Sequence, residues 1–123
     1  MLLVKTKLAV SNIDGIGLFA DENISNGAIV IEGNDKFGIA KYSEQQWHQM
    51  KESLSKESFR QIEKYSYKDK DDSFYYLHLD DARFINHSTN PNIKTIGNQE
   101  IATRDIKKGE EILIDYKDFC EGL

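Results

Sequence analysis

The sequence predicts a mostly β domain interrupted by one short helical insert. Short runs of β-branched and aromatic residues recur along the chain, and glycine-bearing turns separate them, which is the pattern of small strands. Over residues 43–66 the pattern changes, and apolar residues recur three and four positions apart, as on one face of a helix. Strands on both sides of a single helical segment indicate a mostly β domain.

The length and charge of the chain limit what it can be. At 123 residues it is long enough to bury a core and too short for two, so we expect one domain over residues 1–123 and no further module. Its 16 basic and 21 acidic side chains give a net charge of −5, without a basic stripe. Nucleic-acid binding is therefore disfavoured, whereas a basic protein segment would suit an acidic surface.

The sequence predicts neither a metal site nor a membrane span. Cys120 is the only cysteine, and the three histidines lack the spacing of metal ligands. The chain begins without a charged region followed by an apolar run, and no segment approaches the ~20 apolar residues of a span. We therefore expect a cytoplasmic protein.

The predicted strands are short, and a polar turn over residues 68–72 separates the helical insert from the later ones. Two lysines among the apolar residues of the first strand suit the edge of a sheet. The strands cover residues 2–10, 15–20, 28–32, 37–40, 74–79, 93–96, 100–102 and 111–116.

The helical insert of residues 43–66 begins with a capping signal. Ser43 and Gln46 have the spacing of a capping box, in which each side chain bonds the other's backbone N–H. A second run follows over residues 55–65. Each run carries an apolar stripe that we expect to face the core: Trp47, Met50 and Leu54 in the first, Phe59, Ile62 and Tyr65 in the second.

Residues 83–92 form the most unusual stretch. The apolar pair Phe84 and Ile85 runs directly into Asn86 and His87, and a turn cluster follows over residues 88–92. One interpretation is that these polar residues end a strand and cap it. The other is a small-molecule site, because Asn and His offer several hydrogen-bonding groups where an apolar segment breaks.

Two further motifs also allow two interpretations. Gly15 and Gly17 lack the third glycine of a dinucleotide fingerprint, so they form either a turn or a place where bare backbone approaches a ligand. In the strand of residues 111–116, alternation places Tyr116 on the same face as Ile112 and Ile114. This tyrosine is either a core residue or a phenol at the floor of an apolar pocket.

Taken in order, three blocks of this chain resemble the SET domain, the fold of protein-lysine methyltransferases. The blocks are residues 15–20, residues 83–92 and residues 102–116, and a variable insert separates the first two. The resemblance implies a β-clip of small sheets with a C-terminal pseudoknot. It also implies S-adenosylmethionine as methyl donor, no metal, and a lysine-bearing, basic protein or peptide as substrate.

The resemblance also implies roles for individual residues. Tyr116 corresponds to the catalytic tyrosine of the family. The remaining residues correspond to groups around the donor: backbone at Asp14, Gly15, Ile16 and Gly17, the pair Asn86 and His87 at its amino-acid end and adenine, and an upstream aromatic of the donor pocket or lysine channel, Tyr65 or Tyr67.

The chain departs from better-known members of the family, and two other functions stay open. It has no cysteine-rich flank, so we expect Phe119, or a second copy in a homodimer, to complete the lysine channel. Ile114 stands where many members have an aromatic residue that influences how many methyl groups are added. Residues 105–110 resemble a turn of antifreeze-like β-clip modules, which suggests a non-catalytic binding module; a degenerate SET domain would bind the donor without turnover.

Overall fold

Small sheets make up most of the structure, a computed structural model that describes residues 1–33 and 37–122. Three of the four sheets are antiparallel, and in the fourth β7 (Asn86–His87) and β10 (Leu113–Ile114) run parallel. The other sheets are β1 (Thr6–Val10) with β2 (Ile16–Ala20), β3 (Ile29–Glu32) with β9 (Gln99–Ala102) and β8 (Ile93–Ile96), and β4 (Ile39–Tyr42) with β6 (Tyr75–His78) and β5 (Tyr67–Lys68). The predicted mostly β architecture is confirmed.

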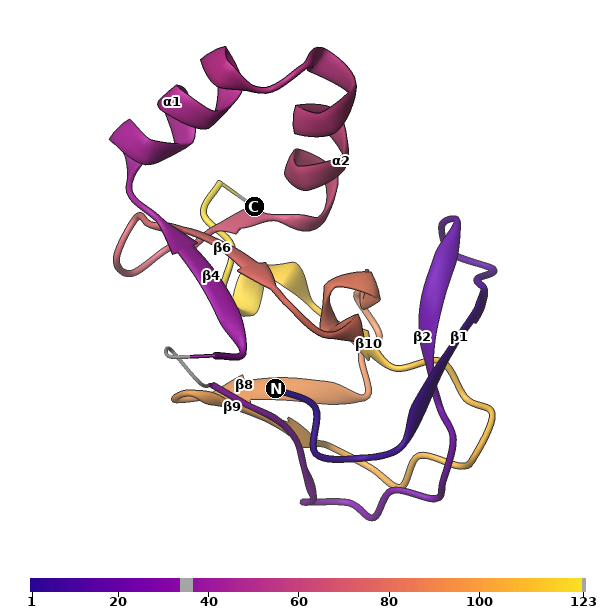
Figure 1. Cartoon of the computed structure of the whole chain (residues 1–123). Helices are drawn as coiled ribbons and strands as arrows, with labels where there is room; N and C mark the ends of the chain where they lie inside the picture. Colours follow the sequence, from indigo (N-terminus) through magenta and orange to yellow (C-terminus); the bar gives the residue numbers. More distant parts are fainter. Residues whose placement is uncertain (34–36, 123) are drawn as a thin grey trace.

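The helical insert consists of α1 (Glu44–Ser53) and α2 (Lys56–Tyr65), which lie beside the β4–β6 sheet (Figure 1). The predicted capping box of Ser43 and Gln46 is present. Trp47 is buried, stacks on Tyr75 with ring centroids 4.3 Å apart, and meets the edge of Phe59 at 5.1 Å. This aromatic group fixes the insert to the sheet, because such pairs bury large apolar areas.

Not every residue of the predicted stripes is buried. Met50 and Ile62 are partly buried. Leu54 is 37% exposed, so its assignment to the core-facing stripe is wrong. The reason is that α1 ends at Ser53 and Leu54 is its extended C-cap, which no longer follows the helical period.

The N-terminal strand is divided between two sheets. We predicted one strand over residues 2–10, but Leu2 bridges to Ile31 and the Leu3 N–H bonds the Val30 carbonyl, 2.9 Å away. The chain then crosses to the hairpin of β1 and β2. The first apolar residues therefore extend the β3 sheet, and only residues 6–10 form the edge strand.

Next to the site, part of one predicted strand and a segment that one interpretation took as a strand end are 3-10 helices instead. Phe84 belongs to η1 (Asp81–Phe84), whose first turn is capped by the Asp80 side chain. Tyr116 begins η2 (Tyr116–Asp118), capped by Asp115, so the strand predicted over residues 111–116 shrinks to β10. In both cases an aspartate that bonds nearby backbone N–H groups ends the extended conformation.

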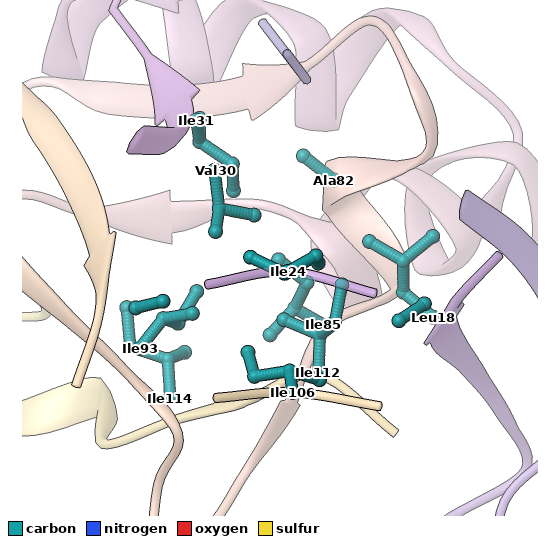
Figure 2. Close-up of a cluster of buried hydrophobic side chains, with 12 residues drawn as sticks. Leu18, Ile24, Val30, Ile31, Ala82, Ile85, Ile93, Ile106, Ile112 and Ile114 are labelled. Atoms are coloured by element: carbon teal, nitrogen blue, oxygen red, sulfur yellow. The ribbon is translucent and has the colours of Figure 1, made fainter. Parts of the chain in front are cut away.

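The core lies between the β3–β9–β8 sheet, the β2 strand and the segment around β10 (Figure 2). Its most deeply buried side chains come from distant parts of the sequence: Leu18, Val30, Ile93, Ile106 and Ile112. Asn92 is the one buried polar residue among those described. Its side chain accepts from the Leu113 N–H at 2.8 Å and donates to the Glu111 carbonyl at 2.8 Å. Asn92 thus satisfies backbone groups that the short β10 leaves unpaired.

The C-terminal segment lies between β7 and β5. After β10, the Phe119 carbonyl accepts from the Lys70 N–H at 3.0 Å, and the Glu121 N–H donates to the Lys68 carbonyl at 2.8 Å. The chain end is therefore held on both sides by segments far from it in sequence, as the predicted pseudoknot requires. Within residues 1–33 and 37–122, no helix is long and apolar enough to cross a membrane.

Candidate active site

Two hydrogen bonds fix Tyr116 to β7 and to Ile85, the residue before that strand. Its backbone N–H donates to Nδ1 of His87 at 3.0 Å, and its hydroxyl donates to the Ile85 carbonyl at 2.6 Å. Because Nδ1 accepts, the His87 ring carries its proton on Nε2. The tyrosine ring therefore has a defined orientation beside Ile85 and His87.

The Tyr116 hydroxyl stays protonated near neutral pH. Burial, followed by the nearby Cys120 and Asp14, raises the pKa of Tyr116 to about 12. A phenol that keeps its proton cannot act as a phenolate base. Since its proton points to Ile85, its oxygen lone pairs remain free to accept weak C–H···O contacts.

Asn86 connects the second and first sequence blocks. Its Nδ2 donates to the Asp14 carbonyl at 3.1 Å and to Oε2 of Glu111 at 3.0 Å, and the Ile16 carbonyl lies 3.5 Å away. An amide has two N–H donors, so the two shorter bonds use both. Its Oδ1 has no hydrogen-bond partner among residues 1–33 and 37–122, and it can accept from a ligand.

Gly17 is required by the packing of Glu111. A Cβ atom on Gly17 would lie 2.4 Å from Glu111 Oε2 and 2.9 Å from its Cδ. That carboxylate cannot easily move, because both its oxygens accept from the Ser11 hydroxyl at 2.8 and 2.9 Å, and Oε2 also accepts from Asn86. Gly17 therefore lets the β1–β2 hairpin approach the Asn86 side chain.

Asn86 meets the predicted backbone contacts of the donor at this hairpin, whereas Tyr65 lines a cavity beside Tyr116 instead. Gly15 has a φ of 47°, a left-handed conformation that glycine adopts without strain. Asp14, Gly15 and Ile16 are exposed and leave their backbone accessible beside Asn86. His87, also predicted at the donor, has a side chain 40% exposed.

A cavity of about 90 Å³ adjoins Tyr116. This is several times the ~10–15 Å³ that one water needs, so the space admits the end of a side chain. Both upstream aromatics considered from sequence, Tyr65 and Tyr67, line it, and Phe119 supplies part of the wall. The other lining residues are Ile31, Lys64, Ser66, His78, Ala82, Arg83, Ile85, Glu100, Ile114 and Cys120.

Arg83 is a site residue that the sequence analysis did not assign. Its guanidinium lies 4.7 Å from the Phe84 ring centroid, and Phe84 meets the edge of Tyr65 at 4.9 Å. Arg83 lines the cavity and also a wider hollow between α2 and η1, together with Arg60 and Lys64. Its place at the head of the 83–92 block was the available signal.

Glu100 and His78 are two further cavity residues that the sequence did not indicate. Burial raises the pKa of Glu100 to about 7, against a hydrogen bond from Thr95 that lowers it. Burial lowers the pKa of His78 to about 4, and its Nδ1 is buried without a partner among the described residues. Both groups are therefore neutral over part of the range between pH 4 and 7.

Other chemistries find little support in the described residues. No group of three or more His, Cys, Asp or Glu side chains within residues 1–33 and 37–122 is placed to hold a metal ion. Burial, with the charge of Asp69, raises the pKa of Cys120 to about 12. Its thiol stays protonated and is a poor nucleophile.

We expect Gly17→Ala to destabilise the protein by about 1–3 kcal/mol through overpacking against Glu111. The same substitution in a Glu111→Ala background should cost clearly less, because the clash is gone. Urea unfolding of the four proteins measures this coupling. Additive effects would show that the contact does not determine the choice of glycine.

We expect Glu100 and His78 to give opposite pH dependences of stability. Below pH 6.5 the unfolded chain binds a proton at His78, whereas in the folded protein the pKa of His78 is about 4. Protonation of His78 therefore destabilises the fold as pH falls. Glu100 has the opposite effect. Between about pH 4.5 and 7 its carboxyl group keeps a proton in the folded protein that the unfolded chain releases, so Glu100 destabilises the fold as pH rises.

Without the carboxyl group of Glu100, the pH dependence of stability that His78 causes should no longer be offset. In Glu100→Gln the free energy of unfolding should rise from pH 4.5 to 6.5 more steeply than in the wild type, by on the order of 1–2 kcal/mol. Urea unfolding at several pH values measures both curves. Parallel curves would contradict the assigned shift of Glu100.

Comparisons with known proteins bear on the family and the fold. The family model described as SET domain matches residues 15–117. A comparison with curated protein sequences gives no match. Among solved structures, a candidate histone methyltransferase of Plasmodium falciparum is 24% identical with a TM-score of 0.60, covering 94% of this chain and 95% of that one.

Two further structures are similar. The Neurospora SET domain protein DIM-5, a histone lysine methyltransferase, is 20% identical with a TM-score of 0.61, over 94% of this chain and 53% of that one. A humanized Chaetomium thermophilum Polycomb Repressive Complex 2 bound to the inhibitor GSK126 is 25% identical with a TM-score of 0.64, over 94% of this chain but 15% of that one. With the family model matched over most of its length, the chain belongs to the SET domain family.

Proposed function

We propose that the protein is an S-adenosylmethionine-dependent protein-lysine N-methyltransferase. The observation that carries the proposal is the position of Tyr116. Its protonated hydroxyl lies at the wall of a mostly apolar cavity, and its backbone N–H bonds His87, the neighbour of Asn86 in β7. A donor at the hairpin and a lysine in the cavity would therefore meet at Tyr116.

The residues around the hairpin suit the methyl donor. The amino-acid end of the donor carries an ammonium group and a carboxylate. The free Oδ1 of Asn86 can accept a hydrogen bond from the ammonium group. For the carboxylate, Arg83 and Lys64 in the hollow between α2 and η1 would supply positive charge. Accessible backbone at residues 14–16 allows close approach of the donor. The half-exposed His87 ring can pack against adenine.

The donor supplies an electrophilic methyl group on a cationic sulfonium. The chain's own residues then have three tasks. The aromatic cavity of Tyr65, Tyr67 and Phe119 removes the lysine from water, which lowers the pKa of its amine and favours the neutral nucleophile. The cavity aligns that amine with the donor. The lone pairs of the Tyr116 hydroxyl orient the methyl group.

A basic protein is the proposed substrate. The net charge of −5 favours a positively charged partner. The similar DIM-5 is a histone lysine methyltransferase, so core histones are a rational first panel. Phe119 lines the cavity, so in this proposal the chain's own C-terminal segment completes the lysine channel without a second copy.

The direct experiment is incubation with methyl-labelled S-adenosylmethionine and separate histones, followed by mass spectrometry of the modified lysines. We expect label on lysine. Protein that binds S-adenosylhomocysteine but labels no substrate in this panel or in a host lysate would favour the degenerate member. Protein that neither binds S-adenosylhomocysteine nor labels a substrate would favour the non-catalytic binding module.

We expect Tyr116→Phe to reduce the rate of transfer at least about a hundredfold, because the hydroxyl that orients the methyl group is lost. Removal of the bond to Ile85 should cost about 1 kcal/mol of stability. Tyr76→Phe is a matched control, because Tyr76 does not line the cavity. Equal transfer by wild type and Tyr116→Phe would refute the assigned role.

A further inference from the structure

Glu100 carries a carboxyl group into a cavity whose walls are otherwise largely apolar and aromatic. It lies in β9, directly opposite Thr95 of β8 and beside Ile31 of β3. Residues opposite each other in antiparallel strands share a face of the sheet. Ile31 also lines the cavity, so the sheet presents Glu100 to the space that Tyr116 adjoins.

Only half of this carboxyl group is satisfied. The Thr95 hydroxyl donates to Oε2 at 2.6 Å. Oε1 has neither a hydrogen-bond donor nor a cation among residues 1–33 and 37–122. A partly buried carboxylate without a partner is costly, so an apolar residue would stabilise this position better.

The groups facing Glu100 do not neutralise it. Asp118 lies behind Thr95 and accepts from its N–H at 3.3 Å, which adds negative charge. Burial raises the pKa of Tyr67 and of Cys120, so both stay protonated and neutral. His78, on β6, is neutral above its lowered pKa of about 4.

Neither of the two cations among the cavity-lining residues is paired with Glu100. The Lys64 ammonium lies 5.4 Å from the centroid of the Tyr65 ring. The Arg83 guanidinium lies over Phe84 and donates to the Asp80 carbonyl at 3.1 Å. Glu100 therefore lines a space that favours a cation from outside the protein.

We propose that Glu100 is a specificity-determining residue that binds the ammonium group of the lysine side chain as it enters the cavity, before that amine loses its proton and can react. The inference rests on the proposed function, since it concerns the substrate of the same site. A carboxylate forms a charge-assisted hydrogen bond with an ammonium group, and the surrounding aromatic faces attract the same charge. A neutral side chain of similar shape would leave the carboxylate unpaired and be rejected.

The recognition depends on pH in a defined direction. With its pKa raised to about 7, Glu100 is largely protonated at pH 6 and largely ionised at pH 8. Binding of an ammonium group favours the ionised form and lowers that pKa. The preference for a cation is therefore stronger at pH 8.

The test uses n-butylammonium and n-butanol, which match the end of a lysine side chain with and without its charge. Their affinities are measured by NMR chemical-shift titration of the wild type, Glu100→Gln and the control Glu32→Gln. Glu32 is an acid of the neighbouring strand that does not line the cavity. We expect wild type and Glu32→Gln to prefer butylammonium at least about fivefold at pH 8, and Glu100→Gln to lose most of that preference.

A second measurement uses the wild type alone and so does not depend on whether a variant folds. The preference of the wild type for butylammonium over butanol should be smaller at pH 6 than at pH 8. An undiminished preference in Glu100→Gln, or at pH 6, overturns the inference, as does the absence of butylammonium binding to the wild type. Failure of the proposed function is distinguishable, because it appears as absent methyl transfer by a protein that still binds butylammonium through Glu100.

Discussion

The pairing of β7 with β10 is the constraint on which the site depends. Each strand contributes two residues, and so short a pair is not stable alone. The Tyr116 N–H bond to His87 and its hydroxyl bond to Ile85 reinforce it, linking residues 29 and 31 positions apart. The Asn92 side chain adds two more bonds from the core side. Tyr116, the first residue of the short helix η2, thus gains a fixed position from its neighbours.

Polar groups near this pairing trade stability for placement. Glu111 is held by Ser11 and Asn86 at the cost of excluding any side chain from position 17. Glu100 and His78 border the cavity with incomplete hydrogen bonding. Such groups are unfavourable in a core but useful where charge must be recognised. The aliphatic core of Figure 2 lies beside this region and provides the compensating burial.

Local signals predicted local structure, and ordered motifs predicted the family. The capping box at Ser43 depends on neighbouring residues only, so the sequence was sufficient. The family resemblance predicted that residues 14–17 and Asn86 lie together, although periodicity alone left both motifs ambiguous. The extended conformation expected at Phe84 and Tyr116 was wrong, because Asp80 and Asp115 cap short helices there. Glu100 was not predicted, because its position at the cavity arises from sheet register, which no nearby residue reveals.

The central claim is that Asn86 and the glycine hairpin form a site for the methyl donor, on which the function of Tyr116 depends. Calorimetry with S-adenosylhomocysteine tests it most directly, using the wild type, Asn86→Ala and the exposed control Asn90→Ala. We predict that wild type and Asn90→Ala bind with equal affinity and that Asn86→Ala binds at least about tenfold more weakly. No binding by the wild type, or equal binding by Asn86→Ala, would contradict the account.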